Sequence, residues 1–337
     1  MYANSVENKG LKGYCNKYKY SEPSITVTGR GDLGKSFIRK YPFDACGRLL
    51  ILIPKCSLDL IFISEYINNK LHIFMESTGV PQLTAPTFKS YKIKVPSFEE
   101  QKKLGDILFL LNKKINLFNL KLKNYQRFKK YCLQNLFSED KKLRFKNLQV
   151  EDNSDWKKFI LKDILLSSSS NLSMADLEDN FGDYKLYGAT GFIKCIDFFD
   201  QKEGYMAIVK DGAGVGKTFL CDPKSSVLST LLYLTPKKDY NLKFCYYLLK
   251  TLHFGKYKVG STIPHIYYKD FSKEKVFIPS VEEQEKIARF LTAIDKKIDF
   301  TQNQITEMEK FKKGLLQQMF VYLHFFMSSY MLNILWK

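Results

Sequence analysis

The sequence contains Val95-Pro-Ser-Phe-Glu-Glu-Gln-Lys-Lys-Leu104 and, 183 residues later, Ile278-Pro-Ser-Val-Glu-Glu-Gln-Glu-Lys-Ile287. The two copies align without a gap. Upstream of them, Gly29–Ser36 is similar to Gly212–Thr218, and Ser77–Pro81 is similar to Ser261–Pro264, at nearly the same offset. A period of this length is far longer than a solenoid repeat. It predicts two copies of one domain, each closed by the same element.

That closing element is a long helix. Ser97 with Glu100, and Ser280 with Glu283, form capping boxes that predict where each helix begins. Beyond each cap the apolar residues recur at alternating steps of three and four, which is the spacing of a coiled-coil seam. The predicted helices span residues 97–137 and 280–320. We expect them to pair with each other as an antiparallel coiled coil and to leave outer faces for a second protein.

Both helices interrupt the seam with a lysine at the same place in the repeat, Lys129 and Lys312. A lysine on a seam lowers stability and often fixes the register or the choice of partner. We expect such a role for these two residues.

The segments before the helices carry short β-branched and aromatic runs separated by Gly, Pro and Asp, which is typical of small α+β domains. The predicted fold class is therefore α+β: two small domains joined by two long helices, with a pseudo-twofold internal repeat. The predicted boundaries, besides the helices, are residues 1–96 for the first domain, 138–150 for a linker, 151–279 for the second domain and 321–337 for an apolar tail. The second domain opens near Trp156, and the first has no counterpart of that opening, so we expect it to be N-terminally shortened.

Composition points to a polyanionic partner. The 337 residues include 53 Lys and Arg against 35 Asp and Glu, a net charge of +18 that is spread along the chain. Collagen-like and wholly disordered chains are excluded by the ordinary 45% hydrophobic content. The cysteine count is odd and contains no Cys-x-x-Cys pair, which fits a reducing cytoplasm. Polar residues interrupt the apolar stretch from Met319 to Trp336, so we expect no membrane span there.

Gly29-x-x-x-x-Gly34-Lys35-Ser36 matches the pattern of a phosphate-binding loop, which would indicate a nucleotide-dependent enzyme. Such a loop needs a helix after it, whereas Pro42 follows within two turns. The second copy has Asp211 where the first glycine of the pattern must stand. We therefore predict a glycine-rich turn between two strands, whose amides and lysine could seat a DNA phosphate or which could be a plain hairpin.

The candidate DNA-binding residues come from these turns, from the hydroxyl-rich loops before the helices and from nearby cations. They are Arg30, Lys35, Arg39, Thr78, Gln82, Lys210, Lys217, Ser261, Thr262 and His265. Arg30, Arg39 and Arg48 lie in the first domain and residues 150–277 contain no arginine, so we expect guanine reading in the first domain above all. No catalytic motif and no metal-ligand spacing occurs, and we expect neither catalytic residues nor a cofactor or metal in this chain.

The two Pro-Ser-x-Glu-Glu-Gln helix starts, Lys210-Asp-Gly-Ala-Gly-Val-Gly216 and Lys312-Lys-Gly-Leu-Leu-Gln-Gln-Met-Phe320 resemble the DNA-specificity (S) subunit of type I restriction-modification systems over residues 10–320. The resemblance implies two target recognition domains, each reading one half of a split double-stranded DNA sequence, and helices that dock methyltransferase subunits, expected to be two. Those subunits would bind S-adenosylmethionine, and an ATP-dependent restriction subunit would join through the complex.

Three alternatives stay open at this point. The chain could be a nucleotide-dependent enzyme that uses Gly29–Ser36, a coiled-coil interaction protein with incidental charge, or a truncated, non-functional specificity cassette. The shortened first domain and the apolar tail are the two departures from the family pattern.

Overall fold

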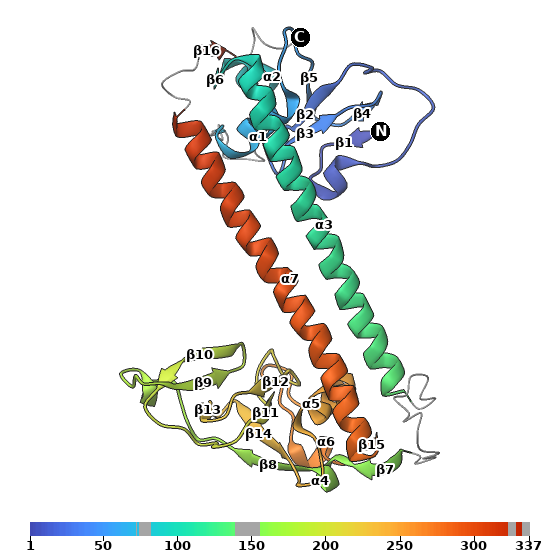
Figure 1. Cartoon of the computed structure of the whole chain (residues 1–337), viewed down its shortest axis with the longest axis vertical. Helices are drawn as coiled ribbons and strands as arrows, with labels where there is room; N and C mark the ends of the chain where they lie inside the picture. Colours follow the sequence, from blue (N-terminus) through green and yellow to red (C-terminus); the bar gives the residue numbers. More distant parts are fainter. Residues whose placement is uncertain (72, 74–81, 139–155, 323–327, 332–337) are drawn as a thin grey trace. The chain divides into compact units, whose positions relative to one another are not determined.

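The computed structural model describes residues 1–71, 73, 82–138, 156–322 and 328–331. The chain divides into a first unit, Met1–Lys121 with Thr301–Lys337, and a second unit, Leu122–Phe300. Two long helices, α3 (Phe98–Leu136) and α7 (Val281–Tyr322), contribute to both units (Figure 1). Short strands and helices make up the rest of each unit, so the fold is α+β, as the sequence predicts.

The helices begin where the capping residues place them. The hydroxyls of Ser97 and Ser280 accept hydrogen bonds from the amides of Glu100 and Glu283, each at 3.4 Å. In the first unit the early part of α3 shares a core with the late part of α7. In the second unit the late part of α3 shares a core with the early part of α7. The helices therefore run antiparallel, and the predicted pairing is confirmed.

The second unit is built from three sheets and short helices (Figure 1). Its largest sheet has the strand order β12-β11-β14-β8, in which all neighbours are antiparallel. The smaller sheets are β10-β9-β13 and β15-β7. The strands are β7 (Lys157–Ile160), β8 (Leu165–Ser169), β9 (Tyr184–Gly188), β10 (Gly191–Ile196), β11 (Tyr205–Val209), β12 (Thr218–Cys221), β13 (Ser225–Val227), β14 (Leu231–Pro236) and β15 (Lys275–Ile278). The helices besides α3 and α7 are α4 (Leu161–Ile164), η2 (Ala175–Leu177), α5 (Leu242–Thr251), η3 (Phe254–Tyr257) and α6 (Tyr268–Phe271).

The first unit is a smaller version of the same plan. Its described residues form the sheet β3-β2-β5, a parallel pair β1-β4 and an antiparallel pair β16-β6. The strands are β1 (Tyr2–Ala3), β2 (Ser24–Thr28), β3 (Ser36–Arg39), β4 (Ala45–Cys46), β5 (Leu49–Leu52), β6 (Lys92–Val95) and β16 (Ser328–Met331). Its short helices are η1 (Glu7–Gly10), α1 (Leu60–Asn69) and α2 (Ala85–Ser90). The predicted linker, apart from Ser138, lies outside the described residues.

A glutamine from the repeated motif joins each domain to its long helix. The side chain of Gln101 donates to the Pro96 carbonyl at 2.9 Å and accepts from the amide of Asp59, the N-cap of α1, at 3.2 Å. Gln284 makes the same two bonds, to the Pro279 carbonyl at 3.1 Å and from the amide of Asn241, the N-cap of α5, at 3.0 Å. Both side chains are buried, at 2% exposure. One amide thus satisfies the chain entering the long helix and the start of the domain helix beside it.

The apolar tail supplies a strand that the sequence did not reveal. In the second unit β15, which leads into α7, pairs with β7, so that Ile278 lies opposite Lys157. In the first unit β6, which leads into α3, pairs with β16 in the corresponding register, with Val95 opposite Ser328. Lys157-Lys-Phe-Ile-Leu161 and Ser328-Ser-Tyr-Met-Leu332 also correspond in sequence. The tail therefore takes the place that the opening strand has in the second unit. No helix in the described part of the chain has the length and apolarity that a membrane crossing requires.

Removal of the tail is expected to destabilise the first unit alone. Deletion of residues 323–337 leaves β6 without its partner, at about 1 kcal/mol for each ladder hydrogen bond lost. Urea unfolding followed by limited proteolysis would show earlier cleavage in residues 1–96, while the second unit serves as an internal control. Equal resistance of both units in the deleted and full-length chains would contradict this role.

Replacement of the joining glutamine is expected to loosen one unit at a time. Gln284→Ala leaves the Asn241 amide and the Pro279 carbonyl unpaired, at about 1–3 kcal/mol for each buried group. The midpoint of urea unfolding should fall for the second unit in Gln284→Ala and for the first unit in Gln101→Ala. Lys296→Ala, an exposed change on α7, is the matched control and should leave both midpoints in place.

Candidate DNA interface

The glycine-rich turn of the first unit connects β2 and β3, which are antiparallel neighbours. The Gly34 amide donates to the Thr28 carbonyl at 2.8 Å, and the Thr28 amide donates to the Lys35 carbonyl at 3.0 Å. Gly31 and Gly34 both have a φ of 73°, a conformation that favours glycine. Lys35 is exposed at the end of this turn.

The second unit repeats the turn between β11 and β12. The Gly216 amide donates to the Val209 carbonyl and the Val209 amide donates to the Lys217 carbonyl, both at 2.9 Å. Gly216 has a φ of 87°, and a Cβ added there would lie 2.7 Å from the Cβ of Phe254, so the position excludes other residues. Lys217 is exposed, as Lys35 is.

A strand follows the turn in both units, so the predicted glycine turn between strands is confirmed. A phosphate-binding loop requires the N-terminus of a helix at that position. The nucleotide-binding alternative therefore lacks the element that would hold the phosphates.

The structure brings each turn together with the segment that precedes the closing helix. Arg30 forms a β-bridge with Gln82, and Asp211 forms the equivalent bridge with His265. The Leu83 amide donates to the Gly29 carbonyl at 2.8 Å, and in the second unit Ile266 donates to Lys210 at 2.9 Å. Predicted residues from distant parts of the sequence thus become neighbours within each unit.

Side-chain contacts strengthen these bridges. Nδ1 of His265 lies 2.7 Å from Oδ1 of Asp211. In the first unit the guanidinium of Arg48 donates to the side-chain oxygen of Gln82. Arg48 and Asp211 were not among the predicted binding residues, since nothing in the sequence places them beside the loops.

Ser261 and Thr262 lie exposed in a closed loop of the second unit. Val259 and His265 exchange backbone hydrogen bonds of 2.9 and 2.8 Å across this loop, and Gly260 has a φ of 86°. Beside it is a cleft of about 550 Å³ lined by donors that the sequence analysis missed, among them Ser167, Ser168, Ser169, Tyr267 and Lys269. Thr78, the predicted counterpart in the first unit, lies outside the described residues.

Arg39 has a structural role and not the predicted DNA contact. Its side chain is 4% exposed; the guanidinium donates to Oγ1 of Thr26 at 3.0 Å and to the Lys9 carbonyl at 2.7 Å. It also lies 3.6 Å from the centre of the Tyr2 ring. Burial lowers the pKa of this guanidinium. The expectation that three arginines serve the first domain is therefore wrong for Arg39, because β3 directs it into the unit.

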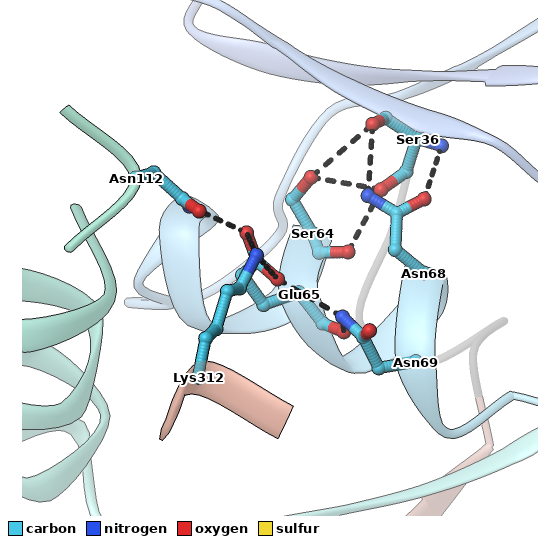
Figure 2. A network of polar contacts seen from close by, with 7 residues as sticks. All are labelled: Ser36, Ser64, Glu65, Asn68, Asn69, Asn112 and Lys312. Atoms are coloured by element: carbon cyan, nitrogen blue, oxygen red, sulfur yellow. Dashed lines mark hydrogen bonds and ion pairs between the residues drawn. The ribbon is translucent and has the colours of Figure 1, made fainter. Parts of the chain in front are cut away.

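In the first unit a polar network connects the turn to the long helices (Figure 2). The Asn68 side chain of α1 accepts from the Ser36 amide at 2.8 Å and donates to the Ser36 carbonyl at 3.1 Å. One turn earlier in α1, Glu65 accepts from Asn112 of α3 at 2.7 Å and forms an ion pair with Lys312 of α7 at 3.0 Å. The residue after Lys35 is thereby fixed to a helix that is itself fixed to both long helices.

The second unit makes a related network with its acid in another place. Lys129 of α3 lies 2.5 Å from Asp295 of α7, which also accepts from the Tyr247 hydroxyl at 2.8 Å. Asp295 stands at the repeat position of Asn112, so the carboxylate lies on the long helix here and on α1 in the first unit. Lys250 of α5 donates to the Thr218 carbonyl at 2.7 Å, next to the turn. Burial, with Lys129 and Lys217 nearby, lowers the pKa of Lys250.

Comparison with known protein families agrees with this repeated arrangement. The family model of the type I restriction modification DNA specificity domain matches residues 1–149 and again residues 153–310. The chain belongs to this family. The two matches divide the specificity chain between its two recognition units at the predicted linker.

Individual relatives agree. A protein named as a type I specificity subunit of Mycoplasma pneumoniae is 30% identical over 107 residues, which is 32% of this chain and 29% of that protein. A type I restriction enzyme specificity subunit of Methanocaldococcus jannaschii is 33% identical over 121 residues, 35% of this chain and 28% of that protein. The matched segments thus span less than a third of these relatives. The crystal structure of an S subunit from M. genitalium has the same fold, with a TM-score of 0.71, 17% identity and coverage of 94% of this chain and 86% of that one.

The turn lysines of the specificity chain give a direct test of the interface. Lys35→Ala and Lys217→Ala are each expected to weaken DNA binding for all sequences and to lower the slope of log affinity against log salt by about one, since one phosphate contact is lost. Titration of fluorescent duplexes at several salt concentrations measures both effects. Affinity unchanged at every salt concentration would identify the turns as plain hairpins.

Proposed function

We propose that this chain recognises a split double-stranded DNA target as the specificity subunit of a type I restriction-modification complex, with each unit reading one half. The observation that carries the proposal is the repeated turn. Each unit presents an exposed lysine, Lys35 or Lys217, on a hairpin bonded to the segment before its closing helix. Two equivalent polyanion-binding elements on a chain of net charge +18 fit two halves of one DNA target.

In this proposal the long helices set the distance between the halves. They contain 39 and 42 residues, roughly 60 Å at about 1.5 Å per residue. Paired helices resist bending better than an extended linker does. Half-sites separated by a fixed number of base pairs, about one helical turn of 34 Å apart, would suit such a spacer.

The long helices are also the proposed docking sites for methyltransferase subunits. In the first unit α3 exposes five large apolar side chains within 14 residues, at 43–63% exposure: Ile107, Phe109, Leu110, Leu117 and Leu120. Apolar patches of this kind mark protein interfaces. The pseudo-twofold repeat suggests two methyltransferase subunits, and restriction subunits would join through the complex. The chemistry would belong to those partners, with this chain supplying the choice of target.

A bipartite target can be tested with the chain coexpressed with its methyltransferase. Once the methylated sequence is mapped, a substitution in either half should cost about 1–3 kcal/mol of binding. Insertion or removal of a base pair between the halves should reduce binding although no read base changes. The His265→Ala variant should relax base preference in one half only, which assigns that half to the second unit. A continuous target, or one indifferent to spacer length, would contradict the proposal.

A further inference from the structure

The connection between η1 and β2 in the first unit combines lysine and tyrosine in an unusual way. Residues 12–19, Lys-Gly-Tyr-Cys-Asn-Lys-Tyr-Lys, contain three lysines and two tyrosines, and the sequence has no acidic residue between Glu7 and Glu22. We call residues 12–19 the Lys/Tyr loop. Tyr14 is 95% exposed and Tyr18 is 62% exposed. Two large aromatic rings thus lie in solvent among cations that no nearby acid in the sequence neutralises.

Both ends of the Lys/Tyr loop are attached to the body of the unit. At its start Lys12 donates its amide to the Met1 carbonyl at 3.1 Å, and the Met1 amino group donates to the Gly13 carbonyl at 2.8 Å. Directly after its end Tyr20 forms a β-bridge with Phe43, and their rings stack with centres 5.3 Å apart. Anchored ends restrict where the exposed rings can go, and this lowers the entropy lost when they bind a ligand.

The same framework holds the glycine turn of the proposed DNA interface. Asn4, directly after β1, donates to the Arg30 carbonyl and accepts from the Gly29 amide, both at 2.7 Å. β1 therefore touches the turn at one end and begins beside Met1, which holds the loop, at the other (Figure 1). A DNA duplex seated on Lys35 would lie within the same unit as the Lys/Tyr loop.

The second unit has no such loop at the corresponding place. Residues 197–204, which lead into β11, read Asp-Phe-Phe-Asp-Gln-Lys-Glu-Gly, with three acids and one lysine. Their aromatic rings are packed: Phe198 lies against the core and Phe199 lies 4.8 Å from Tyr184. The lysine-tyrosine composition is therefore no general requirement of this connection.

From this contrast we infer that the Lys/Tyr loop is an additional DNA contact, which binds the sugar-phosphate backbone flanking the first half-site. The inference rests on the proposed function. Lysine ammonium groups pair with phosphates, and tyrosine hydroxyls are common donors to phosphate oxygens. The rings have an apolar face that can pack against deoxyribose. Contacts of this kind carry no base preference, so the loop adds affinity for the first side of the target without adding to the sequence that is read.

The test uses the full chain in complex with its methyltransferase and duplexes whose flank is trimmed next to one half-site or the other. Wild-type affinity should fall when the flank beside the first half-site is removed and should respond less to trimming on the second side. The variant Lys12→Gln/Lys17→Gln/Lys19→Gln should bind long and short flanks equally, with a salt slope lower by up to about 2.7. Tyr14→Ala/Tyr18→Ala should lose affinity for the long flank, by about five-fold if the rings contribute as stacking aromatics do, with the slope unchanged.

Lys202→Gln, in the corresponding connection of the second unit, is the matched control and should bind as the wild type does. Loop variants that fold, retain the mapped target and bind long flanks with wild-type affinity and slope would overturn the inference and leave the proposed function standing. Loss of methyltransferase copurification, with DNA binding unchanged, would overturn it in favour of a protein contact. A wild-type complex that binds no DNA would overturn both.

Discussion

A buried side-chain amide at the base of each long helix fixes the geometry of the whole chain. Gln101 and Gln284 each bond the proline carbonyl before the helix and the amide that begins the neighbouring domain helix. A glutamine can do both because it offers a donor and an acceptor on one planar group. At 2% exposure neither backbone group can turn to water instead. The direction in which each long helix leaves its domain is thereby set by two hydrogen bonds.

The networks around the two seam lysines build on that joint. Lys312 and Lys129 each end on a carboxylate, Glu65 in the first unit and Asp295 in the second. Single, partly buried ion pairs contribute little net stability, but an unpaired lysine or carboxylate there would be costly, so they favour one register of the helices. The prediction that the seam lysines serve register is consistent with these pairs. In the first unit the network continues through Asn68 to Ser36, beside the turn that carries Lys35, so helix pairing and turn position depend on one helix.

The two units have diverged around a common frame. The turn, the bridge to the segment before the helix and the glutamine joint are present in both. The first unit draws the partner of β6 from the C-terminal tail, whereas the second begins with its own β7. The connection before the central hairpin is basic and exposed in the first unit and acidic and packed in the second. Elements that hold the backbone were retained, and elements that face solvent changed in charge. The two halves of a target would then be bound with the same geometry and with different surfaces.

The sequence by itself determined the repeat, the α+β class, the starts of the two long helices to within one residue and their antiparallel pairing. These follow from local signals: Ser97 and Ser280 cap their own helices, and a seam of 3.5-residue spacing can be buried only against another helix. Only the tertiary structure decided which predicted site residues meet. Arg30 lies beside Gln82 and Lys210 beside His265 because sheet and loop fold back over more than 50 residues, which no local pattern encodes. Arg39 points inward because one register of β3 against β2 puts it opposite Ser24, and a shift of one residue would turn it outward. The tail became a strand because β6 needs a partner for its backbone groups, a demand that arises at the other end of the chain.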